Sequence, residues 1–144
     1  MVTPSTTAIA DLLELLSRML HARGYQHDMF PAQWVALRYF SKARRDLCTA
    51  SELARFQGLA NGPVSRTVRT LLQKGLLAKS KDQPRGKAEL LELTASGRAL
   101  LKLDPCRELE AILSGLGEDA RAQLAGILEG LIRRLSLPAM AKSA

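Results

Sequence analysis

The sequence predicts a mainly helical fold that carries one small β-hairpin, and three observations support this prediction. Hydrophobic residues make up 47% of the chain but aromatic residues only 4%, and the many leucines and alanines favour helices. Apolar residues recur at helical spacing in several segments that begin or end at proline or glycine. One stretch near the middle of the chain instead has two short apolar runs on either side of a Pro-Arg-Gly turn, a pattern typical of a hairpin.

Length and hydropathy narrow the class of protein. The 144 residues suit one compact domain, or a small domain with helical extensions. No apolar run approaches the roughly 20 residues of a membrane span, and the N-terminus lacks the basic start and continuous apolar stretch of a signal peptide. We therefore expect a cytoplasmic protein without a membrane partner.

Two helices are predicted in the N-terminal third. The first spans Ser5 to His21 and has an apolar stripe that is wider than one small core requires. This stripe consists of Ile9, Leu12, Leu13, Leu15, Leu16, Met19 and Leu20. Pro31 opens the second helix, because proline fits the first helical position. The side chains of this helix that we expect to point mostly inward are Trp34, Val35, Leu37 and Phe40.

A short third helix is predicted next. Thr49, with Glu52 three residues later, forms a capping box at its start, and Gly58 ends it. The residues expected to face the core are Leu53, Ala54 and Phe56.

The fourth helix is amphipathic and basic. It follows the turn "LANG", with Pro63 at its first position and Gly62 or Asn61 as the cap. Gly75 ends it in the left-handed conformation that glycine adopts readily. Its apolar face consists of Val64, Val68, Leu71 and Leu72, with Thr67 at the margin. Its opposite face presents Ser65, Arg66, Arg69 and Gln73.

The hairpin completes the pattern. Residues 76–81 and 88–94 read as two strands, and residues 82–87, "DQPRGK", supply Pro84 and Gly86 for the turn. Two helices joined by a short turn and followed by a hairpin make a winged helix-turn-helix. The predicted fold is thus a winged helix-turn-helix with additional N- and C-terminal helices.

The positive charge of the chain gathers on this segment. The formal net charge is +7, and residues 62–87 hold seven cations against one acid, Asp82, which gives a local charge of +6. An α-helix fits the major groove of B-DNA, where Arg66 and Arg69 can donate two hydrogen bonds each to guanine and Ser65 can reach phosphate or base. Cations of the hairpin can reach the adjacent minor groove or its phosphates. These predicted DNA contacts are Ser65, Arg66, Arg69, Gln73, Lys79, Lys81, Arg85 and Lys87.

Three segments resemble the multiple antibiotic resistance regulator (MarR) family of bacterial transcription factors. "FPAQWVALRYF" is similar to its second helix, "CTASELARFQGLANGPVSRTVRTLLQKGLL" to its helix-turn-helix, and "GKAELLELTASGRALL" to its second wing strand and the following helix. The order of these blocks, ending in "LT-x-x-G", makes the resemblance specific. It implies a homodimer on a palindromic operator, usually a repressor that is released by a small-molecule effector or by oxidation.

The hairpin departs from this family in one place. The family often has an Asp-x-Arg unit directly before the second strand, whereas the same register here holds Arg85, Gly86 and Lys87. Asp82 is displaced towards the first strand, so the sequence does not predict the contact by which that aspartate braces the arginine in the family. Arg85 is the better candidate for entering the groove, because its planar guanidinium suits a narrow groove.

The C-terminal helices support dimerisation independently of the resemblance. Together with the first helix they have more apolar surface than a winged domain of about 65 residues can cover, and such patches mark interfaces. We therefore predict a dimerisation region at 1–30 and 95–144 and a DNA-binding domain at 31–94; an intrachain helical bundle is the alternative. The C-terminal stripes are Leu109, Ile112, Leu113 and Leu116, then Leu124, Ile127, Leu128, Leu131, Ile132 and Leu135.

Other functions find less support. The chain has no nucleophile, phosphate-binding or dinucleotide motif, so we expect neither an enzyme nor a cofactor, and His21 and His27 lack the partners of a metal site. A winged module for RNA or protein is an alternative, although few aromatic residues are available to stack unpaired bases. Cys48 and Cys106 are candidate redox residues: Cys48 precedes a helix N-terminus that would favour a thiolate if the side chain were exposed.

Overall fold

The computed structural model describes residues 2–58, 60–84, 86 and 88–136. Contacts divide the chain into two units, residues 1–105 and residues 106–144. The first unit contains the helices α1 (Thr6–Arg23), α2 (Pro31–Lys42), α3 (Ala50–Gln57), α4 (Asn61–Gln73) and α5 (Ala95–Leu101), the 3-10 turn η1 (Arg45–Leu47) and the strands β1 (Leu77–Lys79) and β2 (Leu91–Leu93). The second unit contains α6 (Cys106–Ser114) and α7 (Glu118–Leu135).

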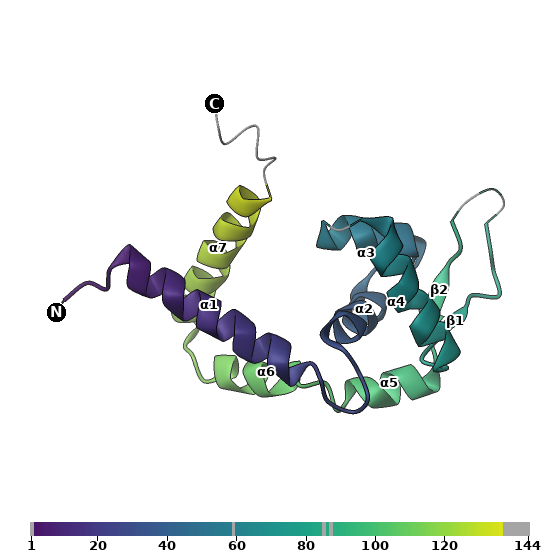
Figure 1. Cartoon of the computed structure of the whole chain (residues 1–144), viewed down its shortest axis with the longest axis horizontal. Coiled ribbons are helices and arrows are strands. Elements are labelled where there is room, and N and C mark those ends of the chain that lie inside the picture. The colour runs from purple at the N-terminus through teal and green to yellow at the C-terminus, as the bar shows by residue number, and fades with distance from the viewer. Residues whose placement is uncertain (1, 59, 85, 87, 137–144) are drawn as a thin grey trace. The chain divides into compact units, whose positions relative to one another are not determined.

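The predicted fold class is confirmed. A core forms where α2, α3, α4 and the hairpin meet, and Figure 1 shows α3 and α4 together beside the two strands. We call α2 to α5 with the hairpin the winged core. Its largest fully buried side chains are Trp34, Leu37, Leu53, Leu71 and Leu77.

Helix α3 has the predicted cap residues, but the capping box is only half formed, because the N–H of Thr49 donates to the carbonyl of Leu47 and not to the Glu52 side chain. Thr49 caps the helix by accepting a hydrogen bond from the N–H of Glu52 at 3.1 Å, and Gly58 ends it at φ 66°.

One side chain of α3 also does not face the core. Phe56 is 70% exposed, so the prediction that it faces the core was wrong. The helical period places Phe56 beside Leu53 but opposite Ala54, at the margin of the buried face, where its ring lies 5.2 Å from that of Tyr39.

Helix α4 starts slightly earlier than predicted. Its N-cap is Ala60, which makes no side-chain capping bond, so neither Gly62 nor Asn61 is the cap. Pro63 stands third in the helix, where its missing N–H is still one of the first four that have no partner within a helix. Gly75 follows the helix with φ 74°, as predicted.

The two strands pair antiparallel with Leu77 opposite Leu93, and they are shorter than predicted. Beyond them the Gln83 side chain holds the hairpin together in place of a regular ladder. Its amide donates to the carbonyls of Ser80 and Leu90 and accepts from the N–H of Leu90, at 2.7 to 2.8 Å.

The "LT-x-x-G" motif joins the hairpin to α5. Thr94 caps α5 by accepting from the N–H of Gly97 at 3.0 Å, and its hydroxyl donates to the carbonyl of Gly75 at 2.7 Å. A Cβ atom on Gly97 would collide with the carbonyl of Leu76, so only glycine fits this close approach. The motif therefore fixes α5 against the end of α4 and the first strand.

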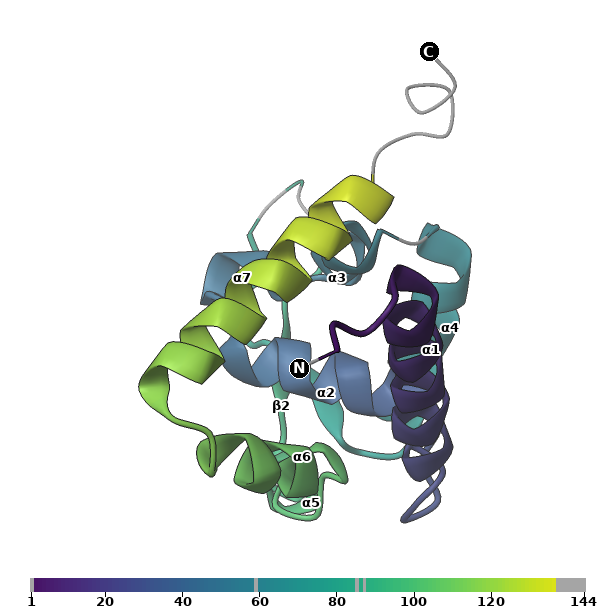
Figure 2. The ribbon, with the colours of Figure 1, turned by 90° about the vertical axis from the view of Figure 1, so that its left-hand side faces the viewer.

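The remaining helices have no buried side chains. None of the 18 residues of α1 or the 18 residues of α7 is buried, and the same holds for α6. Both views show that α6 and α7 meet at a steep angle (Figures 1 and 2). The exposed large apolar side chains of these helices include Ile9, Leu12, Leu15, Leu16, Met19, Ile112, Ile127, Leu131 and Ile132.

Candidate nucleic-acid interface

The outward face of α4 carries the polar side chains that the sequence placed there. Ser65, Arg66, Arg69 and Gln73 are all exposed, while the opposite face is buried in the core through three apolar side chains. No described carboxylate pairs with either arginine. Both guanidinium groups are thus available to a partner outside the chain.

The hairpin adds cations next to this face. Lys79 is exposed at the end of β1 and pairs with Glu89 across the hairpin at 3.4 Å, which lowers its net contribution to the local charge. Lys81 is exposed as well. Arg85 and Lys87, two of the predicted DNA contacts, lie outside the described residues.

Asp82 has an arginine partner, but from an unexpected segment. The guanidinium of Arg45 donates to Ser80 Oγ at 3.1 Å and to Asp82 Oδ2 at 3.2 Å. Arg45 belongs to the turn η1 between α2 and α3, more than 30 positions earlier in the chain. The hairpin is therefore braced from the connection that precedes the helix-turn-helix, a contact that the sequence analysis did not anticipate.

A second ion pair joins α2 to the segment that follows α5. Arg38 on α2 contacts both carboxylate oxygens of Asp104, at 2.6 and 2.7 Å. The Asp104 side chain is only 7% exposed, in the segment directly after α5. Two parallel hydrogen bonds between charged groups fix orientation as well as distance, so α2 and the end of α5 are held in one geometry.

The two candidate redox cysteines differ in their surroundings. Cys48 is buried, and its thiol lies 3.4 Å from the carbonyl oxygen of Arg44. Burial raises the pKa of Cys48 above its ordinary value of 9.0, and the carboxylate of Asp46 raises it further. The exposed thiolate that redox sensing requires is therefore not favoured at Cys48. Cys106 is half-buried at the start of α6.

The described part of the chain has no cluster of side chains suited to a metal ion. There, no three side chains of His, Cys, Asp or Glu gather as metal ligands would, and His21 contacts Tyr25 instead. Among the same residues, no helix has the length and apolar character needed to cross a membrane.

Comparison with known proteins finds solved structures that are similar in fold to this chain. No family model matches the chain, and no curated protein matches it. A MepR–DNA complex from S. aureus is similar with a TM-score of 0.70 and 21% identity, covering 91% of this chain and 96% of that one. A MarR/EmrR family transcriptional regulator from Acinetobacter sp. ADP1 has a TM-score of 0.68 at 19% identity, covering 93% and 98%.

A probable transcriptional regulator from Pseudomonas aeruginosa is similar at 26% identity with a TM-score of 0.64, covering 85% of this chain and 96% of that one. The likeness extends over nearly the whole length of each of these proteins, not only over the helix-turn-helix. The chain therefore has the winged-helix fold of MarR-type regulators, and the resemblance found in the sequence is confirmed as a likeness of fold.

Proposed function

We propose that this chain is a MarR-type transcriptional regulator that binds double-stranded DNA sequence-specifically, with α4 as the recognition helix. The observation that carries this proposal is the outward face of α4. It presents Arg66 and Arg69 without carboxylate partners from the described residues, on a helix whose other face is fixed in the core. A helix with this arrangement fits the major groove, where arginine reads guanine.

We further propose that the protein is a homodimer on a palindromic operator. The exposed apolar stripe of α1, together with those of α6 and α7, supports this, because monomeric soluble proteins rarely expose contiguous apolar patches of this kind. Residues 1–30 and 95–144 would form the dimerisation region and residues 31–94 the DNA-binding domain. A two-fold axis would then present two α4 helices about 34 Å apart, one turn of DNA.

The regulator acts in the cytoplasm as a repressor that a small-molecule effector releases. The resemblance to the MarR family supports this part of the proposal. The buried, weakly acidic thiol of Cys48 favours a ligand over an oxidant as the signal.

The test of DNA binding uses a duplex selected from a random pool with the full chain. Affinity for this duplex should fall steeply as salt rises, because each phosphate contact releases counterions. Arg66→Ala or Arg69→Ala should cost about 1 to 3 kcal/mol and relax the preference at one base position in each half-site. Lys81→Ala, which removes one exposed cation of the hairpin, should instead weaken binding equally on all sequences.

Two results would contradict the proposal. If the two arginine variants lost affinity equally on every sequence, α4 would contact only the DNA backbone. If the chain preferred single-stranded RNA of the same length, it would be an RNA-binding module and not a transcriptional regulator.

A further inference from the structure

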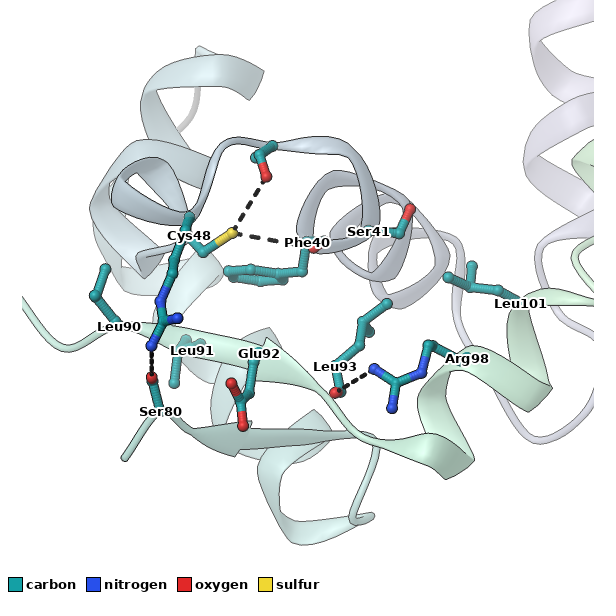
Figure 3. Close-up of a pocket in the computed structure, with 12 residues that line it drawn as sticks. Phe40, Ser41, Cys48, Ser80, Leu90, Leu91, Glu92, Leu93, Arg98 and Leu101 are labelled. Atoms are coloured by element: carbon teal, nitrogen blue, oxygen red, sulfur yellow. Dashed lines mark hydrogen bonds between the residues drawn. The ribbon is translucent and has the colours of Figure 1, made fainter. Parts of the chain in front are cut away.

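Two cations of the first unit hold elements together through main-chain carbonyls. Figure 3 shows one of them: the guanidinium of Arg98 donates to the carbonyl of Leu93 at 3.0 Å, which holds α5 to the end of β2. The other is Lys74 at the end of α4, whose ammonium donates to the carbonyl of Asp28. Asp28 lies 46 positions earlier, in the connection of residues 24–30 between α1 and α2. This contact therefore joins the connection to α4.

Lys74 is attached to a closed last turn of α4. It is the C-cap residue of the helix, and its N–H donates to the carbonyl of Thr70 at 2.9 Å. The N–H of Gly75 donates to the carbonyl of Leu72 at 3.1 Å, which closes the same turn. The Lys74 side chain is only 29% exposed, so neighbouring atoms restrict it. The position of the ammonium group is therefore tied to the last turn of α4.

The ammonium of Lys74 is engaged within the chain, although Lys74 is one of the seven cations of residues 62–87. Besides the hydrogen bond to the Asp28 carbonyl, it lies 3.9 Å from Oδ2 of Asp28 and 3.9 Å from Sδ of Met29. Arg66 and Arg69 differ from it, because no described carboxylate pairs with them. The charge of Lys74 is therefore directed at the connection, and not at a partner outside the chain.

The connection has a backbone conformation that needs support. His27 and Asp28 are the described non-glycine residues with positive φ, at 58° and 57°. Residues with a Cβ atom rarely adopt this left-handed region, and they stay there where the surroundings hold them. The Lys74 ammonium on the Asp28 carbonyl and the burial of Met29, which is 2% exposed, supply that support.

The same connection fixes the end of α1. Gly24, the C-cap residue of α1, lies directly against Pro31, the first residue of α2. A Cβ atom on Gly24 would lie 2.6 Å from the Pro31 ring. Between these two residues, the N–H of Met29 donates to the carbonyl of Gln26 at 3.1 Å. The connection is therefore tight, and its conformation sets how α1 leaves the winged core.

We propose that Lys74 is a positioning residue that couples the connection between α1 and α2 to the recognition helix α4. Its ammonium holds the carbonyl of Asp28, so the direction in which α1 leaves the winged core and the placement of the last turn of α4 depend on each other. Lys74 does not contact DNA phosphate. The coupling within the chain does not rest on the proposed function, whereas its effect on DNA binding does.

A double-mutant cycle by urea unfolding tests the coupling without DNA. Asp28→Pro excludes a positive φ and Asp28→Asn keeps it accessible, while both remove the carboxylate. In the Asp28→Asn background, Lys74→Met should raise the equilibrium constant of unfolding about fivefold, because the donor to the carbonyl is lost. In the Asp28→Pro background the same change should have no effect, because the carbonyl has already moved. An equal effect of Lys74→Met in both backgrounds, or none in either, would overturn the proposal.

Operator binding by the full-length chain tests the effect on α4. Lys74→Met should weaken binding about fivefold and leave the salt dependence unchanged, because no phosphate contact is lost. Lys81→Ala, the matched loss of an exposed cation, should lower the salt slope by about one. Asp28→Pro should weaken binding as Lys74→Met does, and Asp28→Asn should not.

The results separate this inference from the proposed function. A salt slope lowered by about one in Lys74→Met would make Lys74 a phosphate contact and overturn the proposal. Unchanged operator affinity in Lys74→Met would overturn it as well, because α4 would keep its position without the ammonium. A wild-type chain that binds no duplex would contradict the proposed function and leave the unfolding cycle to decide the coupling. If Asp28→Pro does not fold, the affinity and salt slope of Lys74→Met decide.

Discussion

Helices α4 and α1 both carry an apolar stripe at helical spacing, but the structure uses them differently. Three side chains of the 13-residue α4 are buried in the core, whereas none of the 18 residues of α1 is buried. The same sequence pattern therefore predicts an apolar face without telling where its partner is. For α4 the partner is the rest of the winged core, and for α1 we propose a second copy of the chain.

This difference separates two kinds of stability. The winged core is held by burial within one chain, so its stability should not depend on protein concentration. The stabilisation of α1, if a second copy covers it, must depend on concentration, because dimer formation shifts the folding equilibrium by mass action.

The largest expected effect comes from a cavity in the winged core. Leu71 is fully buried, so Leu71→Ala should lower the free energy of unfolding by about 3 kcal/mol at every protein concentration. Leu12 is the matched residue of α1, and Leu12→Ala should lower stability only in a concentration-dependent way. Urea unfolding at two protein concentrations measures both. If Leu12→Ala cost as much at both concentrations, α1 would pack within its own chain.

The next largest effect is expected at the ion pair between Arg38 of α2 and Asp104 after α5. Asp104→Asn removes the negative charge that two nitrogens of Arg38 contact and should lower the free energy of unfolding by about 2 kcal/mol. A double-mutant cycle with Arg38→Gln measures the coupling between the two side chains. Additive effects of the two variants would show that the pair does not hold α5 to α2.

A smaller effect is expected at the brace between Arg45 and Asp82. Both side chains are well exposed, so the coupling energy in a double-mutant cycle of Arg45→Gln and Asp82→Asn should be about 0.5 kcal/mol. The wing should nevertheless lose its position, and operator affinity should fall a few-fold in Arg45→Gln. Arg44→Gln removes the neighbouring exposed cation, and an equal loss there would show that charge alone is responsible.

The smallest effect is a pH dependence from Cys48. Its pKa is raised by burial in the folded chain, so the neutral thiol is favoured and the resulting stabilisation is present below pH 9. This stabilisation is lost as pH rises through the folded pKa, because the unfolded chain ionises first. Urea unfolding from pH 8 to 10.5 should show a steeper decline in the wild type than in Cys48→Ala. Parallel curves for the two proteins would contradict the assignment.

The sequence predicted those parts of the molecule that depend on local spacing. The face of α4 with Arg66 and Arg69 follows from its 3.6-residue period, and the caps of α3 follow from Thr49 and Gly58. These features depend on residues within one or two turns of each other, which a sequence shows directly.

Contacts between distant segments could not be predicted in this way. Nothing in the sequence pairs Arg45 with Asp82, or Lys74, one of the seven cations counted as basic surface, with the carbonyl of Asp28. Phe56 was placed in the core together with Leu53 and Ala54, although only these two residues of α3 are buried.

The stoichiometry of the DNA complex tests the central claim most directly. It depends both on α4, which we propose contacts the DNA, and on α1, which we propose joins two copies of the chain. The full chain is mixed with a duplex selected from a random pool, and the mass of the complex is measured by sedimentation or native mass spectrometry. We predict two chains on one palindromic duplex, and one chain after Leu12→Glu and Leu16→Glu remove the apolar stripe of α1. One wild-type chain per duplex, or no duplex recovered from the pool, would contradict the account.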